Sequence, residues 1–172
     1  MMHLYTGEGK GKTTAAVGLA VRHLGSGGSL AFVQFLKSTP SGEIAVLESL
    51  PRATVLRNRE QHGFAFHMSE EQKQRVTAAH NENLAKAQEM VRHKSVSMLV
   101  LDELLAAYAL GLIDRDAVDA LILSAKEAGV ELVITGRDPA PGFVEAADYI
   151  TEMRPIRHPY EKGVPARKGI EY

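Results

Sequence analysis

Residues 5–18 read YTGEGKGKTTAAVG and join a glycine-rich stretch to a run of residues suited to a helix. A phosphate-binding loop, or P-loop, has the pattern G-x-x-x-x-G-K-S/T and lies between a β-strand and a helix. Residues 11–13 match the end of this pattern, but its first glycine falls on Thr6, and Gly7 comes one position later. The stretch therefore predicts a strand, a P-loop with a displaced first glycine, and a helix.

Each part of this loop has a chemical role. Glycines allow backbone amides to point at an anion without obstruction by a Cβ, and the helix N-terminus adds partial positive charge. We expect Lys12 to reach the phosphates of a nucleotide as a point charge and Thr13 to offer its hydroxyl to Mg²⁺ or Mn²⁺. A glycine-rich turn without a ligand is the alternative, which the coincidence of strand, glycines, GKTT and helix disfavours. The nucleotide-binding residues predicted from the loop are Gly7, Glu8, Gly9, Lys10, Gly11, Lys12, Thr13 and Thr14.

Short apolar runs alternate with amphipathic stretches along the rest of the chain. The predicted strands are HLYT (3–6), SLAFVQFL (29–36), ATVLR (53–57), SMLVLD (97–102), VELVIT (130–135) and DYITEM (148–153). The predicted helices cover about 12–24, 43–50, 70–93, 104–110 and 116–128. Several strands are too continuously apolar to have a wet face, which is typical of buried parallel strands. We predict one α/β domain over residues 1–172 with a P-loop NTPase-like (RecA-like) fold, in which helices flank a mostly parallel six-stranded sheet.

Two local signals mark helix ends. Ser69 precedes a run of acidic and amide side chains, so its hydroxyl can cap the free amides of a helix that starts at Glu70. Gly129 follows the fifth predicted helix as a C-terminal capping glycine would.

The composition excludes several classes of protein. The 172 residues include 20 Lys and Arg against 21 Asp and Glu, so the net charge of −1 gives no general attraction to nucleic acid or anionic membranes. There is no cysteine, which rules out disulfides and thiolate metal sites. The start MMHLYTG lacks the layout of a signal peptide, and apolar runs fall well short of the roughly 20 residues of a membrane span. We expect a soluble cytoplasmic protein with no nucleic-acid or membrane partner.

A second candidate element is the acidic pair Asp102 and Glu103, which ends the apolar run SMLVLDE. The carboxyl end of a parallel strand is where a metal held by Thr13 could be met, directly or through water. We therefore predict a metal site of Thr13, Asp102 and Glu103. Capping of the following helix by one of the two carboxylates is an equally ordinary role for Asp102, and the motif alone leaves the choice open.

Arg137 follows the strand VELVIT at 130–135. It could stabilise a phosphoryl group in transfer, as arginines do in some P-loop enzymes, or simply solvate a loop. We include it among the nucleotide-binding candidates. The rest of the sequence reveals no base or water-positioning group that would identify phosphoryl transfer.

Seven segments occur in the order and spacing of one protein family. They are YTGEGKGKTTAA (5–16), VQFLK (33–37), HGFAF (62–66), VLDEL (100–104), ITGR (134–137), ADYITEMRPIRHPY (147–160) and KGIEY (168–172). On these segments the chain resembles the P-loop ATP:corrinoid adenosyltransferases, of the type called cob(I)yrinic acid a,c-diamide adenosyltransferase. The resemblance covers nearly the whole chain and includes the displaced first glycine.

The resemblance implies a reaction in which ATP loses its adenosyl group rather than a phosphoryl group. The loop would hold the triphosphate of MgATP as a leaving group while cobalt(I) of a reduced corrinoid attacks the 5′ carbon of the ribose. Lys12, Lys10, the loop amides and Mg²⁺ would stabilise the charge on the departing triphosphate. The resemblance also favours Glu103 as metal ligand and implies a homodimer and an electron-donating reductase or flavoprotein.

The resemblance assigns Phe64 and Phe66 to the corrinoid. They would lie beneath the corrin and exclude water and the lower axial ligand, so that cobalt(II) is more easily reduced; with Lys12 they are the candidate catalytic residues. The i, i+2 spacing equally allows two core residues on one face of a strand, and this alternative stays open. His62 and His67 flank the pair, but two imidazoles with no third ligand do not predict a metal site.

Two other functions remain open on the sequence. An ordinary P-loop kinase or ATPase would act on the γ-phosphate and yield ADP with orthophosphate or a phosphorylated acceptor. A non-catalytic nucleotide-binding module would bind ATP and turn over nothing. The basic C-terminal tail does not predict nucleic-acid binding, because Glu152, Glu161 and Glu171 interrupt it and no aromatic stacking platform is evident.

Overall fold

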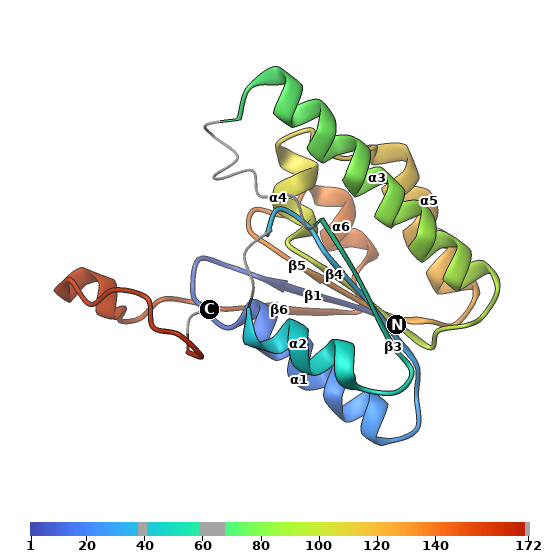
Figure 1. Ribbon diagram of the computed structural model, residues 1–172, viewed down its shortest axis with the longest axis horizontal. Helices are drawn as coiled ribbons and strands as arrows, with labels where there is room; N and C mark the ends of the chain where they lie inside the picture. The colour runs from blue at the N-terminus through green and yellow to red at the C-terminus, as the bar shows by residue number, and fades with distance from the viewer. Residues whose placement is uncertain (38–40, 59–67, 171–172) are drawn as a thin grey trace.

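The structure is a computed structural model, and it describes residues 1–37, 41–58 and 68–170 (Figure 1). Within these residues six parallel strands form one sheet in the order β3-β2-β4-β5-β1-β6. The strands are β1 (Met2–Thr6), β2 (Leu30–Gln34), β3 (Ala53–Arg57), β4 (Met98–Asp102), β5 (Glu131–Thr135) and β6 (Tyr149–Glu152). All six lie where the apolar runs predicted them, and the predicted P-loop NTPase-like fold is confirmed.

Helices cover both faces of the sheet (Figure 1). They are α1 (Lys12–Gly25), α2 (Gly42–Ser49), α3 (Glu70–Arg92), α4 (Leu104–Ala109), α5 (Arg115–Glu127) and α6 (Pro141–Ala146), followed by the short 3₁₀ helix η2 (Pro159–Lys162). The first five agree with the predicted helices within one residue or two. Neither α6 nor η2 was predicted from the sequence, because α6 buries only Phe143 and η2 buries no residue, so neither has the repeated apolar positions that indicate a helix. No helix in the described part of the chain is long and apolar enough to cross a membrane.

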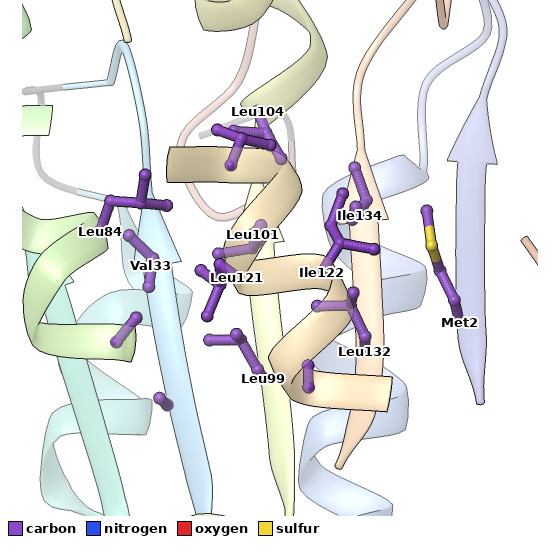
Figure 2. Close-up of a cluster of buried hydrophobic side chains, with 14 of the residues drawn as sticks. Met2, Val33, Leu84, Leu99, Leu101, Leu104, Leu121, Ile122, Leu132 and Ile134 are labelled. Carbon is purple, nitrogen blue, oxygen red and sulfur yellow. The ribbon is translucent and has the colours of Figure 1, made fainter. Parts of the chain in front are cut away.

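Each face of the sheet carries its own hydrophobic cluster. In β2, Leu30 and Phe32 belong to the cluster with α1 and α2, whereas Ala31 and Val33 belong to the cluster with α3, α4, α5 and α6. Figure 2 shows part of the second cluster, where side chains of β1, β2, β4 and β5 meet those of α3 and α5. Because both faces of the central strands are covered, apolar residues are needed at successive positions, which explains the continuous apolar runs in the sequence.

The helix-end signals are confirmed by the hydrogen bonds. The Ser69 hydroxyl accepts a hydrogen bond from the Gln72 amide at 3.2 Å, and the Gln72 side chain accepts one from the Ser69 amide at 2.8 Å, which together make a capping box. Gly129 has a φ of 70° directly after α5, a conformation that glycine adopts more readily than other residues. Local chemistry therefore sets these boundaries.

The sheet order brings distant segments to one edge. Strand β5 lies between β1 and β4, and its register pairs Tyr5 with Thr135 and Leu101 with Ile134. The loop after β1, residue Asp102 at the end of β4 and residue Thr135 at the end of β5 consequently meet at the carboxyl edge. This is where open parallel sheets bind ligands.

The substitution of glycine by alanine at two positions tests how this framework packs. Gly18 is exposed within α1, and an added Cβ would meet nothing within 4 Å, so Gly18→Ala should stabilise the protein by about 0.5–1 kcal/mol. Gly136 has a φ of 150°, and its added Cβ would lie 2.5 Å from the Leu105 Cβ, so Gly136→Ala should cost about 1–3 kcal/mol. Urea denaturation of both variants measures the difference; equal stabilities would contradict the described packing between β5 and α4.

Candidate functional site

The glycine-rich loop joins β1 to α1 as the motif predicts, and another segment packs closely on it. Gly9 donates its amide hydrogen to the Met153 carbonyl at 2.7 Å, and a Cβ on Gly9 would lie 2.7 Å from the same oxygen. A Cβ on Gly7 would lie 2.5 Å from it. These glycines are therefore required by the backbone that follows β6 as well as by any anion. The amide of Gly9 is already used within the protein.

Lys12 begins α1 and is almost fully buried in the loop. Its ammonium donates hydrogen bonds to the carbonyl oxygens of Gly7 at 2.5 Å and Gly9 at 2.8 Å. Burial lowers the pKa of Lys12, and the positive charges of Arg137 and Lys37 lower it further, while nearby glutamates act in the opposite direction. The positive charges that converge here favour the binding of a polyanion.

Asp102 is fully buried and connects the loop to the sheet. Its Oδ1 accepts hydrogen bonds from the hydroxyls of Thr13 and Thr135, both at 2.8 Å. Its Oδ2 accepts one from the side-chain amide nitrogen of Gln34 at 3.2 Å. With these partners Asp102 does not cap α4, so the capping alternative for this residue is wrong. The carboxylate instead orients the Thr13 hydroxyl that the motif assigns to a metal.

Glu103 holds the N-cap position of α4 in a left-handed conformation, with a φ of 60°. Its side chain makes no capping hydrogen bond and instead lines the pocket described below. Its backbone amide donates to the Thr135 hydroxyl at 2.9 Å. A non-glycine residue in this conformation is uncommon, and the effect here is to direct the carboxylate toward the loop.

The loop opens into a pocket of about 520 Å³, a size suited to a nucleotide-sized ligand. The sequence-predicted residues that line it are Glu8, Gly9, Lys10, Gly11, Lys12, Thr13, Thr14, Glu103 and Arg137. Gly7 and Asp102 are not among the lining residues; the first accepts a hydrogen bond from Lys12, and the second lies beneath Thr13. The structure thus brings most of the predicted nucleotide and metal residues together.

Seven further residues line the pocket and were not predicted as site residues from the sequence. They are Val17, Lys37, Gly42, Glu43, His158, Gly169 and Ile170. Three of the segments quoted for the family resemblance contained some of them, since Lys37 ends VQFLK, His158 lies in ADYITEMRPIRHPY, and Gly169 and Ile170 lie in KGIEY. Their roles could not be read from the sequence because nothing in the local pattern places them beside the loop. The predicted corrinoid residues Phe64 and Phe66, and the neighbouring His62 and His67, lie outside the described residues.

Arg137 faces the pocket and forms an ion pair with Glu8, at 2.7 Å between Nη1 and Oε2. Both side chains are more than half exposed, so the pair contributes little stability, about 0–1 kcal/mol. Such a weak tether leaves the guanidinium available to an anionic ligand.

The donor groups at the pocket suit a hard divalent cation. The Thr13 hydroxyl and the Glu103 carboxylate line the pocket and offer oxygen ligands, which Mg²⁺ and Mn²⁺ prefer, while Asp102 lies beneath Thr13. The described residues contain no group of three or more His, Cys, Asp or Glu side chains that could hold a metal by themselves. Mg²⁺ is usually held by one or two carboxylates together with several waters and oxygens of a bound phosphate chain.

These features define a P-loop nucleotide-binding protein of the α/β class. The loop lies between β1 and α1, and its threonine hydroxyl is bonded to a buried aspartate at the end of a neighbouring parallel strand. The sequence model of the family described as ATP:corrinoid adenosyltransferase BtuR/CobO/CobP matches residues 1–172. The chain belongs to this family, and the resemblance stated from the sequence is confirmed.

Relatives named as corrinoid adenosyltransferases align over nearly the whole chain. A corrinoid adenosyltransferase of Pseudomonas aeruginosa is 35% identical over 170 residues, which cover 98% of this chain and 82% of the relative. A corrinoid adenosyltransferase of Escherichia coli K12 is 34% identical over 177 residues, covering 98% and 84%. Corrinoid adenosyltransferase CobA of Salmonella typhimurium is 33% identical with the same coverage.

The lowered pKa of Lys12 leads to a prediction about stability. The folded protein binds the Lys12 proton less tightly than the unfolded chain, so this group costs stability at neutral pH and the cost disappears as pH rises toward 10.5. Lys12→Met removes this cost together with the hydrogen bonds to Gly7 and Gly9, so it should melt close to the wild-type temperature at about pH 7.5, yet lose the increase in melting temperature that MgATP causes. Thermal melts with and without MgATP test both effects, with the exposed Lys86→Met as control. A Lys12→Met protein that MgATP still stabilises would contradict the assigned role.

Proposed function

We propose that this protein transfers the 5′-deoxyadenosyl group of ATP to cobalt(I) of a reduced corrinoid, either cob(I)yrinic acid a,c-diamide or cob(I)alamin, and releases triphosphate. The reaction would serve adenosylcobalamin biosynthesis or salvage. The observation that carries the proposal is membership of the corrinoid adenosyltransferase family over residues 1–172, in a chain whose P-loop opens into a pocket large enough for ATP. An enzyme that consumes ATP for biosynthesis would act in the cytoplasm.

The proposed step is a nucleophilic substitution at carbon. An electron pair on cobalt(I) forms the bond to C5′ of the ribose, and the bond from C5′ to the triphosphate oxygen breaks. The oxygen leaves with its electron pair as part of inorganic triphosphate, and cobalt becomes formally cobalt(III). The protein has two tasks: to hold cobalt and C5′ in line at close distance, and to stabilise the charge that develops on the leaving group.

The residues of the pocket match the second task. Lys12, Lys10 and the loop amides other than that of Gly9 would bind the triphosphate, and Arg137 lines the same pocket. Lys12 and the loop backbone are held by the fold before the reaction begins, so they need little reorganisation when the charge develops. Family membership favours this chemistry over a kinase or ATPase reaction at the γ-phosphate.

We propose Mg²⁺ or Mn²⁺ as the metal, with Thr13 and Glu103 as its protein ligands. Asp102 would act by orienting the Thr13 hydroxyl, since its oxygens already accept hydrogen bonds from Thr13, Thr135 and Gln34. When bound, the metal would neutralise part of the triphosphate charge. Asp102 was predicted from the sequence to be a metal ligand. Because it is fully buried, its proposed role is now to support the site and not to face the pocket.

Two further parts of the proposal rest on the family resemblance alone. Phe64 and Phe66 remain the predicted corrinoid residues that ease formation of cobalt(I), and they lie outside the described residues. A reductase or flavoprotein would deliver the electron, and the protein would act as a homodimer.

Product analysis gives the direct test of the reaction. Anaerobic incubation with MgATP and chemically reduced cobalamin should yield the spectrum of adenosylcobalamin together with one inorganic triphosphate per molecule formed. Omission of the corrinoid should abolish triphosphate release. ADP with orthophosphate, or a phosphorylated acceptor, would instead identify γ-phosphate chemistry, and ATP binding without any turnover would identify a nucleotide-binding module.

Glu103→Ala should raise the Mg²⁺ concentration needed for half-maximal adenosylation by about tenfold, because the site has few protein ligands and loses a carboxylate. A titration of activity against Mg²⁺ at fixed ATP measures the change. Glu82→Ala, which removes an exposed carboxylate on α3, is the matched control. An unchanged metal requirement in Glu103→Ala would remove Glu103 from the metal site.

A further inference from the structure

Strand β2 ends in a tight turn that the apolar run did not predict. The run predicted a strand to Leu36, but β2 stops at Gln34, and the Lys37 amide donates a hydrogen bond to the Phe35 carbonyl at 2.7 Å. Leu36, the central residue of this three-residue turn, has a φ of 59°. A γ-turn with positive φ at leucine is rare and strained, and such a conformation persists only when surrounding contacts impose it.

His80 of α3 supplies one of those contacts. The ring is fully buried; its Nε2 lies 3.2 Å from the Leu36 amide nitrogen and its Nδ1 lies 2.8 Å from the Leu112 carbonyl oxygen. Because the carbonyl can only accept, Nδ1 carries the proton and Nε2 accepts from Leu36. The ring also packs edge-to-face on Phe35, with centroids 5.2 Å apart. His80 thus ties the turn to α3 and to the segment before α5.

The turn delivers Lys37 to the candidate metal and phosphate groups. The Lys37 ammonium lies 3.2 Å from the Thr13 hydroxyl, 3.6 Å from Oδ2 of Asp102 and 3.7 Å from Oε1 of Glu103. These are the same three residues that the sequence analysis grouped as the metal site. Its side chain is 38% exposed and lines the pocket beside Lys12 and Arg137. A four-carbon stem allows the ammonium to move within that space.

The simplest role for Lys37 would be to neutralise the carboxylates of Asp102 and Glu103. That role does not explain the other cations of the pocket or the strained turn. Four cations, Lys10, Lys12, Lys37 and Arg137, line one pocket, and Arg137 and Lys37 act on Lys12 as like charges, while Glu103 and Glu8 act in the opposite direction. Such an arrangement is favourable when a polyanion binds among them, because each cation then gains a strong charged partner. Likewise, an exposed ion pair would not require a strained turn that a buried histidine holds in place.

We propose that Lys37 is a further triphosphate-binding residue of this site and that His80 is its positioning residue, acting through the turn at Leu36. The identity of the ligand as the triphosphate of MgATP rests on the proposed function. Lys37 contacts the substrate, whereas His80 never reaches it. On binding, the Lys37 ammonium moves from the carboxylates onto the triphosphate, which leaves the oxygens of Thr13 and Glu103 to the metal.

Equilibrium binding tests the role of Lys37 without the adenosylation reaction. Calorimetric titration with MgATP, and separately with magnesium triphosphate, should show Lys37→Met binding both ligands about tenfold or more weakly than the wild type, as expected for loss of a charged hydrogen bond. Lys37→Arg should recover part of the loss, and Lys86→Met should bind as the wild type does. Lys37→Met binding within twofold of a wild type that binds normally would overturn the assignment.

The wild-type measurements separate this inference from the proposed function. A wild type that binds MgATP but forms no adenosylcorrinoid contradicts the reaction and leaves the Lys37 test valid. A wild type that binds neither MgATP nor magnesium triphosphate overturns both the proposed function and the role of Lys37.

A double-mutant cycle tests the positioning role of His80. His80→Leu should weaken MgATP binding by about tenfold when Lys37 is present and by less than twofold in the Lys37→Met background, because both changes remove the same interaction. His80→Gln, which keeps a donor and an acceptor, should restore part of the binding and serves in place of His80→Leu if that variant does not fold. Equal losses in both backgrounds would show that His80 only stabilises the fold and would overturn its positioning role.

Discussion

The hydrogen bond between Thr13 and Asp102, 2.8 Å long, is the contact on which the geometry of the site depends. It joins the start of α1 to the end of β4 across the intervening strand β5, which adds its own hydroxyl from Thr135 to the same carboxylate oxygen. A fully buried carboxylate is costly unless its oxygens are hydrogen-bonded, and here three side chains supply those bonds. The loop, the sheet and the metal-binding hydroxyl are therefore held as one unit.

Several features around this unit are unfavourable for the stability of the folded chain but suit the binding of a triphosphate. Lys12 is buried with a lowered pKa, Glu103 and Leu36 have positive φ values, and Lys37 and Arg137 add like charges. The burial of Lys12 and the positive φ values each destabilise the folded chain to some degree, and such features tend to gather where a ligand binds. The corrinoid chemistry proposed for the family needs this kind of site, because a triphosphate leaving group must be stabilised while no phosphoryl group is transferred.

Some of the site could be predicted from contiguous residues, and some could not. The P-loop pattern correctly placed Lys12 and Thr13 at the start of a helix, and the end of the apolar run correctly placed Asp102 and Glu103 at a strand terminus. Neither of these patterns could show that Asp102 is buried beneath Thr13 while Glu103 faces the pocket. That difference arises from the φ of 60° at Glu103 and from the hydroxyl of Thr135 on a strand far away in sequence.

The sequence by itself determined the class of fold, the position of the loop and the family, because hydrophobic periodicity, glycine spacing and capping signals are properties of neighbouring residues. Tertiary structure alone decided that Met153 lies against Gly9, that His80 fixes the turn at Leu36, and that Lys37 reaches Thr13. These contacts depend on strand order, on register and on how α3 packs against the sheet. A shift of one residue in a strand turns its side chains to the opposite face, so no local pattern could have specified which distant groups meet.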